Sequence, residues 1–353
     1  MTTIKRYHSL DVLKGMAIFL VVMGHVLTMC IRGLDRAAIF KIIGEVHMPL
    51  FFFISGFLSY KEDAEGRAVA PNLLSRARQL LLPMVAVSSI WIYYFPHSGL
   101  ESPLVSTWHG LWYDTFKNGY WFTLVLFEVM LVYWLSLPFL RRFTGFWGGA
   151  LVVISFWGIT WLLWSLLPES VISILSFGLT ARFIPVFLFG VLARRHIQGF
   201  NRICCNGWFL SGSIITAAFT LYYSCWYWEF PMIPAWAGEI FRSVFHIALA
   251  VVAISVATPW CESQFEKQAR PCTAARLLQY LGKESLVIYL FHYFFLFPMG
   301  FVRPVLESMS LGFTPLFFVS AVSAACVICL TLGVAYIIKQ AKPLAVVLTG
   351  AKS

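Results

Sequence analysis

Residues 9–26 read SLDVLKGMAIFLVVMGHV, an apolar run with few polar side chains. About 20 mostly apolar residues in a helix span a hydrocarbon core of about 30 Å. Backbone groups inside lipid must hydrogen-bond within their own segment, so a continuous apolar run of this length is expected to be an α-helix. This stretch therefore predicts a transmembrane helix, and several later stretches have the same character.

The composition of the whole chain also indicates a membrane protein. The 353 residues are 59% hydrophobic and 12% charged, about half the charged fraction of a soluble domain. We predict the fold class of an all-α integral membrane protein, a bundle of about ten transmembrane helices that forms a single membrane-embedded domain over residues 1–353. The expected helices cover about residues 10–30, 42–60, 74–95, 120–140, 146–167, 173–193, 207–227, 236–258, 278–300 and 313–338.

The net charge of +10 raises the question of a nucleic-acid partner. We exclude one, because the basic residues lie in short loops between apolar runs, as the positive-inside rule produces. With the N-terminus inside, three of the 26 Lys and Arg residues fall within spans, namely Lys14, Arg182 and Arg242. Most of the others then fall in inner loops or at the termini, and few fall in outer loops. The charge distribution therefore predicts that both termini are cytoplasmic.

The first expected helix carries two ionisable side chains, Lys14 and His25, which are costly inside a bilayer. They are eleven residues apart, which at 100° per residue is three turns plus roughly 20°, so both lie on one face. The rise places them about 16 Å apart along the axis. A snorkelling lysine and a buried structural histidine are the alternative interpretation. The functional one is a cation at the inner end and a proton-transferring imidazole deeper in the membrane.

The second expected helix contains HMPLFFFISGF, residues 47–57. Pro49 can kink this helix, and Ser55 with Gly56 permits close approach of another helix. His47 enters from the outer side, at a depth near that of His25. An interfacial histidine beside a packing motif is the alternative interpretation.

Basic residues flank the inner ends of two further helices. Arg76 and Arg78 lie in LLSRARQLLLP, residues 73–83, and Arg194 with Arg195 ends RFIPVFLFGVLARR, residues 182–195. These side chains could bind phosphate groups. Charges that only set the topology explain Arg76 and Arg78 equally well.

Other polar side chains lie within the spans. Glu128 follows GYWFTLVLF, residues 119–127, and His292 lies in LGKESLVIYLFHY, residues 281–293. Glu239, Arg242 and His246 share one helix face at i, i+3 and i+7, which favours a mutual ion pair. The histidines lie on separate helices without paired ligand spacing, so we predict no metal site.

These stretches, in this order, resemble the acyltransferase-3 family of bacterial integral-membrane O-acyltransferases. The first-helix hallmark of that family is an arginine, ten residues and a histidine; this chain has Lys14, ten residues and His25. FFFISGF is similar to the second-helix motif, and HMPLFFF to the sugar O-acetylase branch. The basic entry to the third helix, the WF pair, FLFG and SLVIYLFH also fit, so the resemblance covers about residues 9–338.

The resemblance implies an acetyl-CoA-dependent O-acetyltransferase of the bacterial inner membrane. Its acceptor would be a carbohydrate such as O-antigen, exopolysaccharide or a similar glycan, acylated on the outer side. We expect His25 to accept the proton of a sugar hydroxyl, and His47 to position the acceptor or stabilise the oxyanion. The residues expected to bind CoA are Lys14, Arg76, Arg78, Arg194 and Arg195. Those expected to bind substrate are Ser55, Glu128 and His292.

A transporter or flippase for a lipid-linked sugar is the second hypothesis, since helices with buried charges suit it as well. No inverted repeat is visible in the sequence, and the Lys14–His25 spacing has no obvious purpose in transport. Lys14 stands where the family has arginine, a planar fork rather than a point charge. The arginine's role is therefore expected to be altered here, or shared with Arg76 and Arg78.

Overall fold

The computed structural model describes residues 7–31, 37–60, 69–98, 107–226, 234–268, 270–302, 304 and 312–350. Within these ranges every regular element is a helix. Among the described residues, seven helices are long and apolar enough to cross a membrane, or eight if one bent pair forms a single span. The predicted class, an all-α membrane protein, is confirmed, and the expected number of about ten helices is approximate.

The seven long apolar helices contain nearly half of the chain. They are α1 (His8–His25) continued by the π-helical η1 (Val26–Cys30), α2 (Ala38–Ser59), α5 (Trp121–Arg142), α6 (Phe146–Leu166), α8 (Phe177–Arg195), α11 (Ala235–Glu262) continued by η5 (Ser263–Lys267), and α15 (Phe313–Gln340). The bent pair is α9 (Ile197–Cys205) and α10 (Gly207–Trp226). The remaining helices are α3 (Val69–Ser98), α4 (Trp108–Tyr113), η3 (Lys117–Gly119), α7 (Glu169–Leu175), α12 (Thr273–Lys283), α13 (Ser285–Phe291), η6 (His292–Phe295), η7 (Gly300–Val302) and α16 (Lys342–Thr349).

Two expected helices differ from the structure. The helix expected over 278–300 is divided into α12, α13 and the 3₁₀-helical η6, with a break at Glu284. The helix expected over 173–193 is divided into α7 and α8 at Ser176, whose φ of 52° is left-handed. The hydroxyl of Ser176 donates to the Thr115 carbonyl at 2.7 Å, and this contact holds the break.

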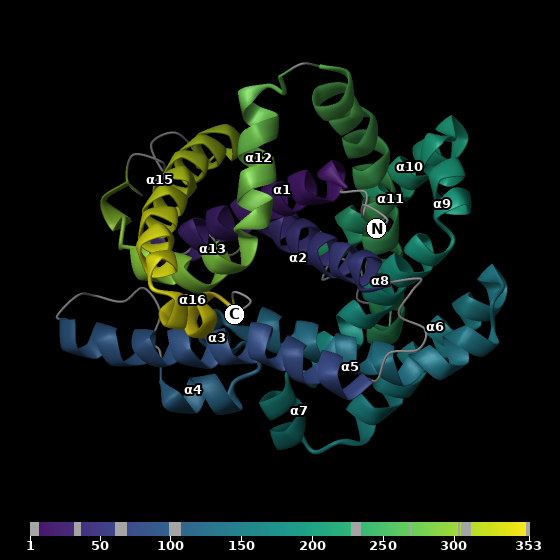
Figure 1. Ribbon diagram of the computed structural model, residues 1–353, viewed down its shortest axis with the longest axis horizontal. Coiled ribbons are helices and arrows are strands. Elements are labelled where there is room, and N and C mark those ends of the chain that lie inside the picture. The colour runs from purple at the N-terminus through teal and green to yellow at the C-terminus, as the bar shows by residue number, and fades with distance from the viewer. Residues whose placement is uncertain are drawn as a thin grey trace.

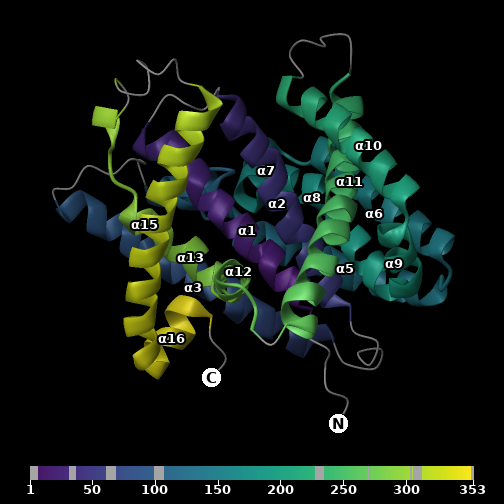
Figure 2. The same cartoon turned by 90° about the horizontal axis from the view of Figure 1, so that it is seen from above.

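Helices α1 and α2 lie side by side at the centre of the bundle (Figure 1). Helix α1 also packs against α12, α11 and α15, while α2 packs against α8. The beginning of α1 and the helix α16 lie toward the same edge of the bundle (Figure 2). That this edge faces the cytoplasm stays a prediction.

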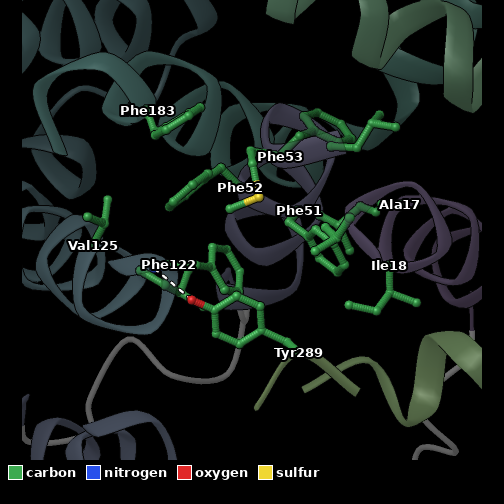
Figure 3. Close-up of a cluster of buried hydrophobic side chains, with 14 of the residues drawn as sticks. Ala17, Ile18, Phe51, Phe52, Phe53, Phe122, Val125, Phe183 and Tyr289 are labelled. Carbon is green, nitrogen blue, oxygen red and sulfur yellow. Dashed lines mark hydrogen bonds between the residues drawn. The ribbon is translucent and has the colours of Figure 1, made fainter. Parts of the chain in front are cut away.

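The core between α2, α5 and α8 is aromatic (Figure 3). The rings of Phe52 and Phe183 stack with centroids 4.4 Å apart, and Phe122 meets Phe52 edge-on at 5.4 Å. The helices approach closely at Gly56, where an added Cβ would lie 1.9 Å from the carbonyl oxygen of Phe187. The expected role of Gly56 in close helix approach is therefore confirmed.

Candidate active site

Helix α1 ends at His25, and the π-helical η1 begins at the next residue. Single π-turns within α-helices are frequent at functional sites. The Nε2 atom of His25 lies 3.1 Å from the hydroxyl of Tyr293, and its ring stacks on that of His292 with centroids 5.1 Å apart. The first predicted catalytic residue therefore lies against a residue predicted to bind substrate, 267 positions further along the chain.

His292 is fully buried at the junction of α13 and η6. Its Nδ1 lies 3.0 Å from the carbonyl oxygen of Ile288 and 2.8 Å from that of Tyr289. Both neighbours only accept hydrogen bonds, so Nδ1 carries the proton and Nε2 is left with a lone pair. That Nε2 has no hydrogen-bond partner among the described residues.

The turn before α5 faces this pair of imidazoles. Three consecutive residues, Lys117, Asn118 and Gly119, have φ values of 50°, 51° and 93°. Left-handed conformations of non-glycine residues cost free energy and persist where the surroundings hold them. The Lys117 ammonium donates to the carbonyls of Trp112 and Ser173 at 3.0 and 2.8 Å, and burial lowers its pKa.

Two tyrosine hydroxyls, from α13 and η6, lie within hydrogen-bond distance of the Gly119 carbonyl oxygen. Tyr289 donates to it at 2.9 Å, and the Tyr293 hydroxyl lies 3.2 Å from it. The hydroxyl of Tyr289 in turn accepts the backbone N–H of Phe122 at 3.1 Å (Figure 3). We call His25, His292, Tyr293 and the Gly119 carbonyl the histidine cluster.

A cavity of about 270 Å³ is lined by residues of α1, α2, α3, α5 and α13, and the four residues of the histidine cluster are not part of its lining. Helix α1 lines it with Lys14, Ile18 and Val21, which follow one another at i, i+4 and i+7. His25 is the next position of the same stripe, as the helical spacing predicted. The facing wall includes Tyr289, so the residue that anchors the Gly119 carbonyl also lines the cavity.

The cavity unites several predicted site residues. Arg76 and Ser55 line it together with Lys14, although the three come from different helices. Arg76 hydrogen-bonds to Gln79 at 3.3 Å, and Lys14 lies 3.9 Å from Asp11. A cavity that is otherwise mostly apolar therefore holds two cationic side chains.

The other predicted CoA-binding arginines lie outside the lining of this cavity. Arg78 is exposed on α3. Arg194 donates to the hydroxyl of Tyr7 and covers that ring at 4.8 Å, while Arg195 donates to the Leu140 carbonyl at 2.6 Å. The structure thus separates Arg194 and Arg195 from the residues that line the cavity.

His47 and Glu128 have different surroundings. The Nδ1 of His47 contacts the carbonyl of Ile43 one turn earlier in α2. Glu128 accepts a hydrogen bond from Thr180 of α8, and its second oxygen has no partner among the described residues. The cavity-lining residues of α5 lie on another face of that helix, so Glu128 is directed toward α8 instead.

A second polar group lies between α2, α8 and α11. We call Glu45, Arg182, Glu239, Arg242 and His246 the ion-pair cluster. Arg182 forms a bidentate pair with Glu239 at 3.0 and 3.2 Å, and Arg242 bridges Glu239 and Glu45. The expected Glu239–Arg242 pair is present, but His246 turns to Glu45 at 3.5 Å instead. Among the described residues, no three His, Cys, Asp or Glu side chains are placed to hold a metal ion.

Sequence reasoning missed Tyr289, Tyr293 and the Gly119 carbonyl. Tyr293 directly follows His292, and Gly119 opens the quoted GYWF stretch, so both lay within motifs already singled out. A tyrosine beside a buried histidine is a weak signal by itself. Only the packing of α13 against the turn before α5 shows that they meet.

The structure defines a helical membrane protein with a stacked imidazole pair, His25 and His292, and a cavity that holds two cationic side chains. The family model of acyltransferase-3, described as an acyltransferase domain, matches residues 7–339. The chain therefore belongs to this acyltransferase family, as the resemblance indicated.

Two relatives match a shorter part of the chain. Nodulation protein NolL of Mesorhizobium japonicum is 42% identical over 81 residues, which are 22% of this chain and 21% of the relative. Nodulation protein NolL of Sinorhizobium fredii is 42% identical over 84 residues, 22% of each chain. The matched segment thus spans about a fifth of these relatives. No solved structure matches the chain significantly.

Proposed function

We propose that this protein transfers an acetyl group from acetyl-CoA to a hydroxyl of a cell-surface or lipid-linked carbohydrate. The observation that carries the proposal is the single stripe of α1, on which the cavity-lining Lys14, Ile18 and Val21 lead to His25. A cavity with two cations suits an anionic donor with a long, narrow arm. The imidazole at the end of the stripe suits proton transfer.

The donor enters this cavity in our proposal. The phosphates of CoA contact Arg76 and the nearby exposed Arg78, because phosphate forms its strongest hydrogen bonds with charged donors. Lys14 lies along the pantetheine arm, where the lining also includes Ile18, Phe51 and other apolar side chains. Lys14 and Arg76 together supply the cationic role that the family gives to one arginine.

The chemical step takes place at His25. A sugar hydroxyl gives its proton to the imidazole while its oxygen attacks the thioester carbonyl carbon. The carbon–oxygen bond forms, the carbon–sulfur bond breaks, and the imidazolium returns the proton to the leaving thiolate. His47, on the neighbouring helix, positions the acceptor or stabilises the oxyanion.

The sides of the membrane follow from the charge distribution of the loops. We propose a multi-pass protein of the bacterial inner membrane with both termini cytoplasmic, so that the donor enters from inside. The acceptor, an O-antigen, exopolysaccharide or similar glycan, approaches from the outer side. Donor and acceptor then meet within the bundle without acetyl-CoA leaving the cell.

Purified protein in lipid nanodiscs tests the reaction. Acetyl-CoA is supplied with lipid-linked glycans from the native membrane, and free CoA is measured by liquid chromatography. We expect CoA release that depends on the glycan, and a glycan product heavier by one acetyl group. A protein that moves the glycan across vesicles but releases no CoA would instead be a transporter.

A further inference from the structure

The hydrogen bonds around Gly119 restrict where each proton lies. The Gly119 carbonyl only accepts, so the hydroxyl of Tyr289 donates to it at 2.9 Å while accepting from the Phe122 N–H. The hydroxyl of Tyr293 has one proton and two neighbours, the Gly119 oxygen at 3.2 Å and Nε2 of His25 at 3.1 Å. Two arrangements are therefore open to Tyr293.

The first arrangement directs the Tyr293 proton at His25. The imidazole would then accept at Nε2 and carry its own proton on Nδ1, for which no hydrogen-bond acceptor is found among the described residues. Neither ring nitrogen would be a free base. The second arrangement directs the Tyr293 proton at the Gly119 carbonyl, so that the Tyr293 oxygen accepts Nε2–H and the Nδ1 lone pair is free.

We propose that Tyr293, anchored on the Gly119 carbonyl, is a positioning residue that holds His25 in its Nε2–H tautomer and makes Nδ1 the base. This proposal rests on the proposed function for its kinetic consequence. Which nitrogen of a histidine carries the proton is set by the hydrogen bond that the other nitrogen makes. Here the Tyr293 hydroxyl and the Gly119 carbonyl set the tautomer of His25.

The hydrogen bonds from His25 to Tyr293 and from Tyr293 to the Gly119 carbonyl also stabilise the charge that develops during the reaction. The acceptor hydroxyl gives its proton to Nδ1, and the resulting imidazolium keeps Nε2–H on the Tyr293 oxygen. That oxygen is polarised because its own proton is donated to the Gly119 carbonyl. When the carbon–sulfur bond breaks, the Nδ1 proton passes to the CoA sulfur, and the tautomer of His25 is restored.

The surroundings fix the Tyr293 hydroxyl in place. Its ring is fully buried and packs against Trp91 and Tyr120, with centroids 5.5 and 5.1 Å away. At Gly119 an added Cβ would lie 2.2 Å from the Tyr293 hydroxyl, so this turn accommodates the tyrosine only with glycine. These contacts hold the hydroxyl between the carbonyl and the imidazole.

Nitrogen-15 NMR of protein labelled at histidine tests the tautomer. The signals of His25 are those missing from His25→Gln protein. We expect Nε2 to show the shift of a protonated ring nitrogen and Nδ1 that of an unprotonated one, and a mixture of both tautomers in Tyr293→Phe protein. Protonated Nδ1 in the wild type, or an unchanged tautomer in Tyr293→Phe, would overturn the proposal.

The kinetic readout uses a matched variant, Tyr120→Phe. Tyr120 is equally buried and donates to the Leu290 carbonyl at 3.1 Å, but its hydroxyl does not contact His25. We expect Tyr293→Phe to lower kcat about 10- to 100-fold, as losing a hydrogen bond to a charged group does. The KM for acetyl-CoA should stay within about twofold, because the interaction strengthens only in the transition state.

Tyr120→Phe protein should retain the wild-type tautomer. A wild-type kcat in Tyr293→Phe, or a mixed tautomer in both variants, would contradict the positioning role. The NMR result needs no acyl transfer, so it decides the tautomer even if the proposed reaction fails.

Discussion

The histidine cluster and the ion-pair cluster both place polar side chains inside the same helical bundle, yet their hydrogen bonding differs. In the ion-pair cluster each arginine and glutamate has an oppositely charged partner, as in the bidentate Arg182–Glu239 pair. In the histidine cluster the groups carry no paired charges, and Nε2 of His292 has no partner among the described residues. Nδ1 of His246 in the ion-pair cluster also lacks a partner among the described residues, so the two clusters differ in the pairing of their charges. Paired charges hold helices together, whereas the imidazoles of the histidine cluster are available for proton transfer.

The largest expected effect comes from removing the His25 imidazole, one turn beyond the cavity-lining Val21 on α1. His25→Ala should lower the rate of acyl transfer about 10²–10⁴-fold, the usual contribution of a general base. Expression and CoA binding should remain, because the donor contacts lie in the cavity. The measurement is the initial rate of glycan-dependent CoA release.

The matched control is a histidine of the ion-pair cluster. His246→Ala also empties a buried imidazole position, but its contacts are Glu45 and Phe183 rather than the cavity. It should keep a rate of the wild-type order. If both variants lose activity equally, the two clusters do not have the separate roles assigned to them.

The next effect concerns stability. Arg242→Ala leaves Glu45 and Glu239 without their shared cation, and breaking a buried ion pair costs about 3–5 kcal/mol of unfolding free energy. Thermal unfolding in detergent measures the loss. Arg182→Ala is the comparison: its side chain is 38% exposed and leaves Glu239 paired with Arg242, so about 0.2–1 kcal/mol is expected. An unaltered melting temperature in Arg242→Ala would contradict the structural role.

The smallest expected effect concerns CoA binding by Arg76, a cation that differs from the arginines of the ion-pair cluster. Arg76 has Gln79 rather than a carboxylate as its partner among the described residues, so its charge is available to a ligand. Arg76→Ala should weaken CoA binding by about 1.5–3 kcal/mol, the value of a charge-assisted hydrogen bond. Isothermal titration with CoA measures this, and the exposed Arg78 should contribute less. Unchanged affinity in both variants would leave these arginines as topology signals.

The parts that the sequence predicts are those that depend on local pattern. Apolar runs predict helices because lipid leaves no other partner for the backbone, and the eleven-residue spacing placed Lys14 and His25 on one stripe of α1. The glycine after Ser55 predicted a close approach, which α8 makes.

The parts that sequence reasoning missed depend on how distant segments pack. The Tyr293 hydroxyl and the Gly119 carbonyl meet across 174 residues, and no periodicity connects them. The meeting of Arg76 with Lys14 at one cavity likewise requires the packing of separate helices. The break at Glu284 separates the amphipathic α12 from the apolar α13, and no proline marks it in the sequence.

In the proposed reaction His25 removes the proton of the acceptor hydroxyl, and a change of nucleophile probes this role. Hydroxylamine attacks thioesters without needing a general base, so it can replace the sugar as acceptor. Transfer to both acceptors is measured in wild-type and His25→Ala protein, with the enzyme-free reaction subtracted. We expect a loss of about 10²–10⁴-fold for the sugar and a much smaller loss for hydroxylamine. Equal losses for both acceptors would contradict a general-base role for His25.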